Sequence, residues 1–296
     1  MRILVLGASG QVAMALGQLR AVDSEIICVG RPQLDLTQTA SIAQTIAQHD
    51  PDAVINAAAY TAVDRAESEV DAAFAVNAHG AGLAAEAAAK AGAAFIHISS
   101  DYVFDGAKPT PWVEDDLPNP LSAYGRSKLA GEKSVMAAHP NAVILRTSWV
   151  YSAGGSNFVR TMLRLAVEGR PLRVVDDQHG APTSAMVIAD AIMAILRRMQ
   201  GRRLAGKGVF HLACRGEVSW CGFARAIMAA SAARSGPQTE IAAITTDEYP
   251  TPARRPANSR LDCGRIARTF GITLPRWQDA LEPVMDTLVR PASLLR

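Results

Sequence analysis

The chain has 296 residues, of which 49% are hydrophobic and 20% charged, and its 30 basic and 28 acidic side chains leave a net charge of +2. This length allows one large domain or two modest ones. The balanced charge argues against nucleic-acid binding, and no apolar run of about 18 residues predicts a membrane span. The apolar start is too short for a secretory signal, and the four cysteines lack metal-ligand spacing. We therefore expect a cytoplasmic protein with reduced thiols.

The first half of the chain alternates short apolar segments with helix-like segments. Strands are predicted at residues 3–6, 25–29, 53–56, 94–99 and 142–147. Helices are predicted at 11–19, at 39–48 with Thr37 or Thr39 as the cap, at 70–91 ended by Gly92, and at 122–138. Because this alternation is typical of parallel βαβ units, we predict an α/β fold with a doubly wound, Rossmann-type parallel sheet.

The second half has a looser pattern. Strands are predicted at residues 172–175 and 209–212, helices at 157–168, 185–199, 219–233 and 276–288, and an ordered loop at 249–259. We expect residues 1–150 to form the dinucleotide-binding domain. Residues 151–296 would form mainly a smaller substrate-binding lobe, with some segments returning to the first domain.

A glycine-containing turn follows the first predicted strand, where residues 7–13 are GASGQVA. Gly7 permits a tight turn, and Gly10 lets the backbone approach a pyrophosphate at the N-terminus of the next helix. Gln11 and Val12 open that helix. A simple tight turn would explain the two glycines alone, but their place at the first strand–helix junction favours a dinucleotide site.

A Tyr and a Lys lie four residues apart at the start of a predicted helix, at Tyr124 and Lys128. These positions share a helix face, so the ammonium group can lower the phenol pKa, which is ordinarily about 10. Ser99 and Ser100 end the preceding strand, and either hydroxyl could hold a substrate carbonyl. Because Tyr-x-x-x-Lys alone also fits an exposed helix face, the prediction of hydride transfer depends on the order of turn, Ser and Tyr–Lys pair.

Cofactor preference is predicted from the end of the second strand. No carboxylate stands there to accept from a ribose 2′-hydroxyl, and Arg31 follows two residues later. A guanidinium can bind a 2′-phosphate, although a solvated loop arginine is the alternative. Asp35 lies further on and would contact the adenosine. We therefore expect NADPH to be preferred and NADH to remain usable.

The sequence resembles the dTDP-4-dehydrorhamnose reductase family, within the extended short-chain dehydrogenase/reductase superfamily, over nearly its whole length. The resemblance is carried by residues 7–12, NAAAYTAVDRAE at 56–67, SSDYVFDG at 99–106, YGRSKLAGE at 124–132, RTSWVY at 146–151, residues 157–158, DQHGAPT at 177–183 and RPANSRL at 255–261.

The resemblance implies reduction of the C4 ketone of dTDP-4-dehydro-L-rhamnose by NAD(P)H, with Ser100, Tyr124 and Lys128 as catalytic residues. Tyr124 would donate the proton, Lys128 would lower its pKa and bind the nicotinamide ribose, and Ser100 would hold the carbonyl. The implied cofactor contacts are Gly7, Gly10, Gln11, Val12, Arg31, Asp35, Leu36, Ala59, Tyr60, Thr61, Ser99, Tyr124 and Lys128. The implied substrate contacts are Ser100, Asp101, Tyr124, Trp149, Asn157 and Arg255.

Some of these roles have alternatives. Trp149 also fits a core aromatic, Arg255 could tie the tail to the sheet rather than meet a diphosphate, and Asn77 is expected to support the strand ends. The first helix has no carboxylate, so no ligand set for Mg²⁺ is identified and a metal-bridged dimer is not expected. A homodimer without metal stays open.

Two other functions fit parts of the pattern. One is a nucleotide-sugar epimerase, dehydratase or other reductase of the same superfamily, although a dehydratase needs further acids and only Asp101 stands beside Ser100. The other is a non-catalytic regulatory subunit, which would not need to keep Ser100, Tyr124 and Lys128 together.

Overall fold

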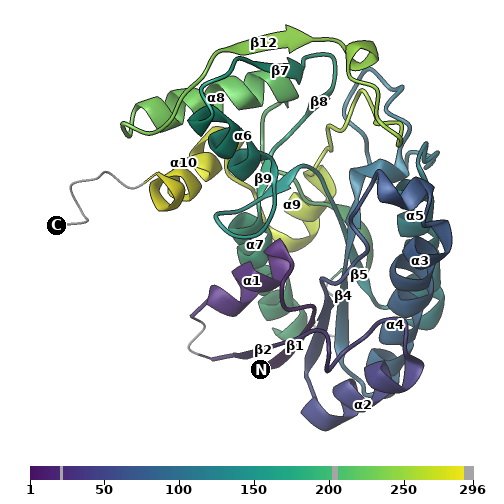
Figure 1. The fold of residues 1–296 in the computed structure, drawn as a ribbon. Helices are drawn as coiled ribbons and strands as arrows, with labels where there is room; N and C mark the ends of the chain where they lie inside the picture. The colour runs from purple at the N-terminus through teal and green to yellow at the C-terminus, as the bar shows by residue number, and fades with distance from the viewer. Residues whose placement is uncertain (21–22, 202–205, 290–296) are drawn as a thin grey trace.

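The computed structural model describes residues 1–20, 23–201 and 206–289, and its centre is a parallel sheet (Figure 1). Every neighbouring pair in this sheet is parallel. The strand order is β10 (Gly208–His211), β5 (Val143–Thr147), β4 (Ala94–Ser100), β3 (Ala53–Asn56), β1 (Arg2–Leu6) and β2 (Glu25–Val29). The predicted fold class is therefore confirmed.

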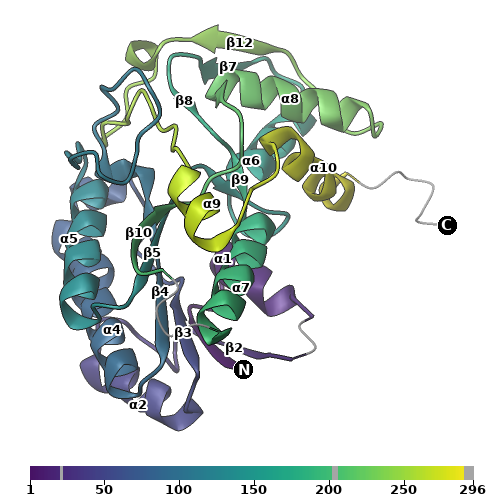
Figure 2. The ribbon, with the colours of Figure 1, turned by 180° about the vertical axis from the view of Figure 1, so that it is seen from behind.

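Helices cover both faces of the sheet, as Figures 1 and 2 show from opposite sides. One face carries α1 (Gln11–Gln18), α7 (Ala185–Gly201) and α9 (Gly264–Phe270). The other face carries α2 (Thr39–His49), α4 (Ala81–Lys90) and α5 (Ala123–Ala138). Two of these elements, α7 and α9, come from the second half of the chain, as does the edge strand β10.

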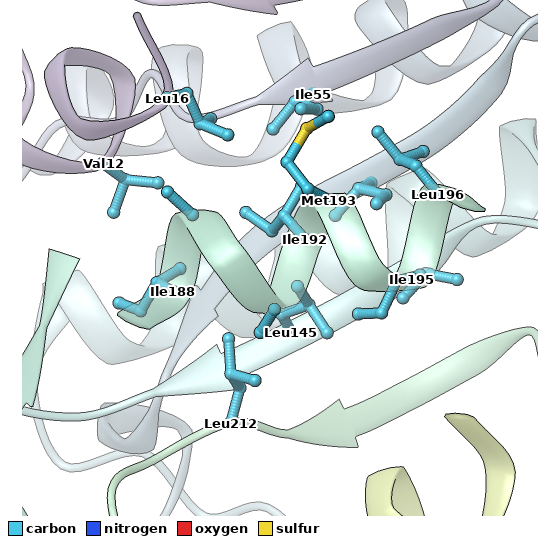
Figure 3. Close-up of a cluster of buried hydrophobic side chains, with 14 of the residues drawn as sticks. Val12, Leu16, Ile55, Leu145, Ile188, Ile192, Met193, Ile195, Leu196 and Leu212 are labelled. Atoms are coloured by element: carbon cyan, nitrogen blue, oxygen red, sulfur yellow. The ribbon is translucent and has the colours of Figure 1, made fainter. Parts of the chain in front are cut away.

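The sheet strands are mainly apolar, and helices bury both faces of the sheet. In β1, Ile3 and Val5 point to the α1–α7 side, whereas Leu4 and Leu6 point to the α2–α4 side. Figure 3 shows the hydrophobic core on the α1–α7 side of the sheet, in which Ile188 and Ile192 of α7 extend towards neighbouring aliphatic side chains. This packing holds the strand ends in fixed positions.

A second group of elements packs around its own core. It contains α6 (Phe158–Val167), α8 (Trp220–Ala232) and α10 (Trp277–Leu288), with the pair β7 (Leu172–Val175) and β12 (Ile241–Ile244). Two short pairs join it to the rest: β6 (Val150–Tyr151) with β9 (Thr183–Ser184), and β8 (His179–Gly180) with β11 (Val218–Ser219). Figure 1 shows this group beyond the carboxyl ends of the sheet strands.

Several predicted details are wrong. The helix expected at residues 70–91 is divided into α3 (Val70–Phe74), a π-helical segment (Ala75–Gly80) and α4. Gln38, not a threonine, precedes α2, because the Thr37 hydroxyl donates to Asp35 instead. The sequence reading also missed β12, α9 and the 3₁₀ turns η1 (Arg65–Glu67), η3 (Asp101–Val103) and η4 (Thr246–Glu248).

No helix within residues 1–20, 23–201 and 206–289 has both the length and the apolar character needed to cross a membrane.

Candidate active site

The polar and glycine segments predicted to meet do lie at one edge of the sheet. Leu6, just before Gly7, pairs with Asn56 at the end of β3. Asn56 in turn neighbours His97 in β4, and Ser100 neighbours Thr147 in β5. Because all of these strands are parallel, their carboxyl ends face the same side, which is where open α/β sheets bind ligands.

The turn after β1 has the geometry that a dinucleotide phosphate needs. Gly7 has a φ of +118°, and a Cβ on it would lie 3.2 Å from the Ala58 backbone nitrogen. Gly10 precedes α1 without a side-chain cap, and a Cβ there would meet only the Ala57 carbonyl oxygen at 3.8 Å. The first N–H groups of α1 therefore have no capping side chain, and the first turn contains no acidic residue.

The start of α5 positions Tyr124 and Lys128. Ser122 caps the helix by accepting from the Gly125 N–H at 3.1 Å. Gly125 packs so closely against the Tyr102 carbonyl oxygen that a Cβ would overlap it. This contact brings the Tyr102 and Tyr124 rings together edge to face, with centroids 5.5 Å apart. One turn later, Lys128 Nζ donates to the Ile98 carbonyl oxygen at 2.7 Å.

Burial controls the protonation of both side chains. Loss of solvation lowers the pKa of Lys128 to about 8, against the opposing attraction of Glu132. Burial also raises the pKa of Tyr124, while the Ser100 hydroxyl within hydrogen-bonding reach acts in the opposite direction. Tyr124 is therefore a neutral phenol that carries a proton to donate, and Lys128, one turn further along α5, remains mainly charged at pH 7. Lys128 is not among the groups that shift the pKa of Tyr124 in this structure, so the lowering expected from the sequence is not seen.

Asp101 is a buried carboxyl next to the reacting groups. The Ser100 hydroxyl donates to its Oδ1 at 3.0 Å, whereas Oδ2 makes no hydrogen bond, although the Ser259 hydroxyl lies nearby. Burial is the main cause that raises the pKa of Asp101 to about 6. The Asp101 carboxyl therefore changes charge near pH 6, which is close to the pH at which the catalytic groups around it would act.

Ser99 and Ser100, which the sequence left as equivalents, have different surroundings. The Ser99 hydroxyl donates to Glu132 Oε1 at 2.6 Å, and the buried Arg146 donates from Nε to Glu132 Oε1 at 2.8 Å and from Nη2 to Glu132 Oε2 at 2.6 Å. Ser100, not Ser99, faces Tyr124. Sequence reasoning missed the Glu132–Arg146 pair, although Glu132 continues the Tyr124–Lys128 stripe at the same spacing.

Asn77, which was expected to support the strand ends, holds the loop after β3 at Tyr60. Its Oδ1 accepts from the Tyr60 N–H at 2.8 Å, and its Nδ2 donates to the Tyr60 carbonyl oxygen and to Ser127 Oγ. The Tyr60 ring packs beside Ala66, and its hydroxyl donates to Glu69 at 2.7 Å. Ala59 and Thr61 flank this fixed residue.

The residues expected to surround an adenosine lie beyond β2. Arg31 is exposed, and its charge contributes to lowering the pKa of Asp35, although the larger cause is hydrogen bonding from Thr37. Leu36 is buried against Gly80. Val12 is buried within α1. Arg31 is thus exposed to solvent beyond β2, whereas Val12 and Leu36 belong to the hydrophobic cores on the two faces of the sheet.

Two predicted ligand residues are used to join the second group of elements to the sheet. Gln11 donates from Nε2 to the Val150 carbonyl oxygen at 3.2 Å, and its Oε1 accepts from Ser152 and Asn157. Asn157 also caps α6 by accepting from the Arg160 N–H. The structure therefore places Gln11 and Asn157 in direct contact, a link the sequence did not reveal.

Trp149 is half-buried and stacks on Trp220, with ring centroids 3.6 Å apart. Its φ is +50°, and Gly180 packs against its indole so closely that a Cβ would overlap it. A side chain held by strain and by stacking presents a fixed aromatic surface next to β5.

Arg255 connects the late loop to the region of Tyr102. Its Nη2 pairs with Asp64 Oδ2 at 2.8 Å, and its Nη1 donates to the Tyr102 hydroxyl at 3.3 Å. The Ala253 N–H also donates to Asp64 at 3.3 Å. The sequence left two roles open for Arg255. In this structure its side chain holds the late loop against Asp64 and Tyr102.

The parallel sheet, the glycine turn after β1 and the Tyr124–Lys128 pair define a Rossmann-type protein of the short-chain dehydrogenase/reductase class. Comparison with known families gives a finer placement. The model of the family described as the RmlD substrate binding domain matches residues 1–290. The chain therefore belongs to this family, and the resemblance inferred from its sequence is confirmed.

Individual relatives agree with this placement. A dTDP-4-dehydrorhamnose reductase of Sinorhizobium fredii is 52% identical over 290 residues, which cover 98% of each chain. A solved dTDP-4-dehydrorhamnose reductase from Clostridium acetobutylicum superposes with a TM-score of 0.90 at 37% identity, covering 97% of this chain and 99% of that one. A Bacillus anthracis reductase solved in complex with NADP has a TM-score of 0.88 at 33% identity, covering 96% and 98%.

Proposed function

We propose that this chain reduces the C4 ketone of dTDP-4-dehydro-L-rhamnose to give dTDP-L-rhamnose, with NADPH as the preferred cofactor and NADH as a usable one. The observation that carries the proposal is the meeting of Ser100, at the end of β4, with Tyr124 and Lys128 on α5, where Ser100 and Lys128 are buried and Tyr124 is partly buried. It is supported by relatives named dTDP-4-dehydrorhamnose reductase, which align with this chain over nearly their full length.

The residues present fit a nicotinamide dinucleotide. The Gly7 turn and the uncapped start of α1 suit the pyrophosphate, Ala59, Tyr60 and Thr61 lie at the adjacent strand end, and Arg31 suits a 2′-phosphate. Lys128 would hold the nicotinamide ribose. When bound, the cofactor supplies the hydride that is added to the C4 carbon.

The protein's own groups complete the reduction. Tyr124 gives its phenolic proton to the oxygen that was the C4 carbonyl, while the Lys128 ammonium group stabilises the phenolate that remains. Ser100 turns its hydroxyl from Asp101 to the same oxygen and orients it. Asp101 and Trp149 line the sugar, and Asn157 and Arg255 would reach substrate only by exchanging their present contacts.

The first and second halves of the chain have different roles in this reaction. Residues 1–150 hold the cofactor and the proton-transfer groups, and residues 151–296 contribute mainly to the substrate side, apart from α7, β10 and α9 on the sheet. Among the described residues no group of three or more His, Cys, Asp or Glu side chains could hold a metal ion, so no ligands are assigned to Mg²⁺.

The purified chain tests the proposal in an NADPH-oxidation assay with dTDP-, UDP- and GDP-linked 4-keto sugars. We expect turnover by the chain alone, with the highest kcat/KM for dTDP-4-dehydro-L-rhamnose. Cofactor that stays bound through purification, without net oxidation, would indicate an epimerase or dehydratase. No turnover with any sugar would indicate a regulatory subunit.

A further inference from the structure

A histidine that the mechanism does not use lies beneath Lys128. Alternate residues of β4 point to the α5 side of the sheet, so Phe95, His97 and Ser99 share this face. Asn56, at the end of β3, is the direct neighbour of His97 in the sheet. Both side chains are about 1% exposed, so neither is hydrated and each needs a protein partner.

The contacts join these residues in a short row. Asn56 Nδ2 lies 3.1 Å from His97 Nδ1, and His97 Nε2 lies 3.5 Å from Lys128 Nζ. The second distance is long for a hydrogen bond, because the ammonium group makes its short one to the Ile98 carbonyl oxygen at 2.7 Å. The imidazole therefore limits the position of the ammonium group from the side opposite to the ligand edge.

Proton positions follow from what each group can donate. An ammonium group has only donors, so His97 Nε2 must accept, and the proton of the neutral ring must be on Nδ1. Nδ1–H then needs an acceptor, and Asn56 Oδ1 has no partner elsewhere. Rotating the Asn56 side-chain amide by 180° exchanges Oδ1 with Nδ2, so that Oδ1 accepts from Nδ1–H. The two orientations of an amide have nearly the same shape.

The charges nearby favour this neutral ring. Burial and the Lys128 charge lower the pKa of His97 well below its ordinary value. Of the other titratable groups, Glu132 on α5 acts on Lys128, and Arg146 on β5 pairs with Glu132. Glu132 is engaged by Arg146 and Ser99, so it does not replace His97 as a close partner of Lys128.

We propose that His97, held by Asn56 as the neutral Nδ1–H tautomer, is a positioning residue that fixes the Lys128 ammonium group by accepting from it at Nε2. This inference rests on the proposed function, since it assigns a role to a neighbour of Lys128. His97 does not touch substrate. Its effect is to favour the charged form of Lys128 and to direct the remaining ammonium protons towards the ligand edge.

The test compares pH profiles of kcat/KM and kcat for His97→Phe, which removes the acceptor, and His97→Gln, which can return one near Nε2. Loss of an acceptor destabilises the ammonium, so the alkaline limb of the His97→Phe profile should move to lower pH by about 0.5 unit or more. We expect kcat to fall about tenfold. His97→Gln should recover part of both losses. His139→Phe, at another buried histidine bonded to the Ala93 carbonyl oxygen, should keep the wild-type limb.

A His97→Phe enzyme with the wild-type alkaline limb and kcat, but a lower Tm, overturns the inference and leaves His97 as a packing residue. Turnover by the wild-type chain separates this failure from that of the proposed function, because a wild-type chain that does not reduce dTDP-4-dehydro-L-rhamnose would refute the function itself, whereas near-normal turnover in Lys128→Met would refute only the role of Lys128. If His97→Phe does not fold, ¹⁵N NMR of the wild-type histidines decides. We expect a neutral Nδ1–H signal for His97, identified by its loss in His97→Gln, and an Nε2–H tautomer would overturn the inference.

Discussion

At the scale of single residues, burial rather than residue type determines which group carries which proton. Lys128 and Asp101 are buried and Tyr124 is partly buried, and loss of solvation is the largest cause of each pKa shift. Burial therefore shifts each pKa towards the neutral form, although Lys128, with a pKa of about 8, and Asp101, with a pKa of about 6, remain mainly charged at pH 7. A neutral phenol beside a lysine with a pKa of about 8 is a suitable proton donor at physiological pH.

Asp101 provides a stability test with a defined sign. Its pKa in the folded chain is about 6, above the ordinary 3.8, so the folded state binds the proton more tightly than the unfolded chain does. The carboxyl group therefore costs stability progressively as pH rises from about 4 to about 6, and the full cost of up to about 3 kcal/mol applies above that range.

Asp101→Asn removes this titration. We expect the stability of the variant, relative to the wild type, to increase between pH 4 and pH 7 by up to about 3 kcal/mol, measured by urea unfolding. Asp71→Asn, at an exposed site on α3, should show no such change. A constant difference for Asp101→Asn across this range would mean that Asp101 titrates normally.

Arg31 provides a test of cofactor choice. If its guanidinium binds a 2′-phosphate, Arg31→Ala should raise KM for NADPH several-fold or more and leave KM for NADH nearly unchanged, as expected from loss of a charge-assisted contact. Arg170→Ala, at an exposed arginine of the second group of elements, is the control. Equal losses with the two cofactors would make Arg31 structural.

At the scale of elements, α5 is held against the π-helical segment by a close contact at Gly131. A Cβ on this residue would overlap the Asn77 carbonyl oxygen. Gly131→Ala should therefore destabilise the protein by about 1–3 kcal/mol, because the helix must move away. The shift should also loosen the Tyr60 loop that Asn77 clamps.

A matched control is Gly17→Ala in α1, where the new Cβ would make an ordinary contact with Cys28 Sγ at 3.4 Å. Removing a helical glycine here should be neutral or stabilising by up to about 1 kcal/mol. Both variants can be compared by urea unfolding. Equal stability of Gly131→Ala and the wild type would show that the α5 contact can relax without cost.

The sequence predicted the elements whose signal is local. The five sheet strands of the first half are mainly apolar runs, and Gly92 ends its helix at a φ of +69°. The π-helical segment has no such signal, because it depends on Asn77 reaching Tyr60 and Ser127. Likewise, strand alternation predicts that Ser99 and Ser100 face opposite sides, but only the packing of α5 shows which one faces Tyr124.

At the scale of the whole molecule, the second half of the chain does not form a separate body. It contributes α7, β10 and α9 to the sheet, while Gln11 and Asn157 bond across to α6. Sequence patterns within one half cannot predict such contacts, since the partners are more than a hundred residues apart. Ligands that contact both halves should therefore stabilise the whole fold.

Thermal unfolding tests this coupling and the nucleotide. At about 100 times its Kd, a ligand that binds only the native state contributes about 2.7 kcal/mol, which corresponds to a Tm increase on the order of 5 °C. We expect dTDP or dTDP-rhamnose to give a larger increase than UDP or GDP at the same concentration. Equal increases with all three would remove the substrate assignment and leave the fold unaffected.

The central claim is that Tyr124 gives the proton that completes ketone reduction, and turnover of Tyr124→Phe tests it most directly. Loss of a general acid predicts a kcat lower by at least ~10²-fold with dTDP-4-dehydro-L-rhamnose, and little change in NADPH affinity. Tyr249→Phe, at an exposed tyrosine, should turn over normally. If Tyr124→Phe keeps a kcat within a few-fold of the wild type, the proton comes from elsewhere and the account is wrong.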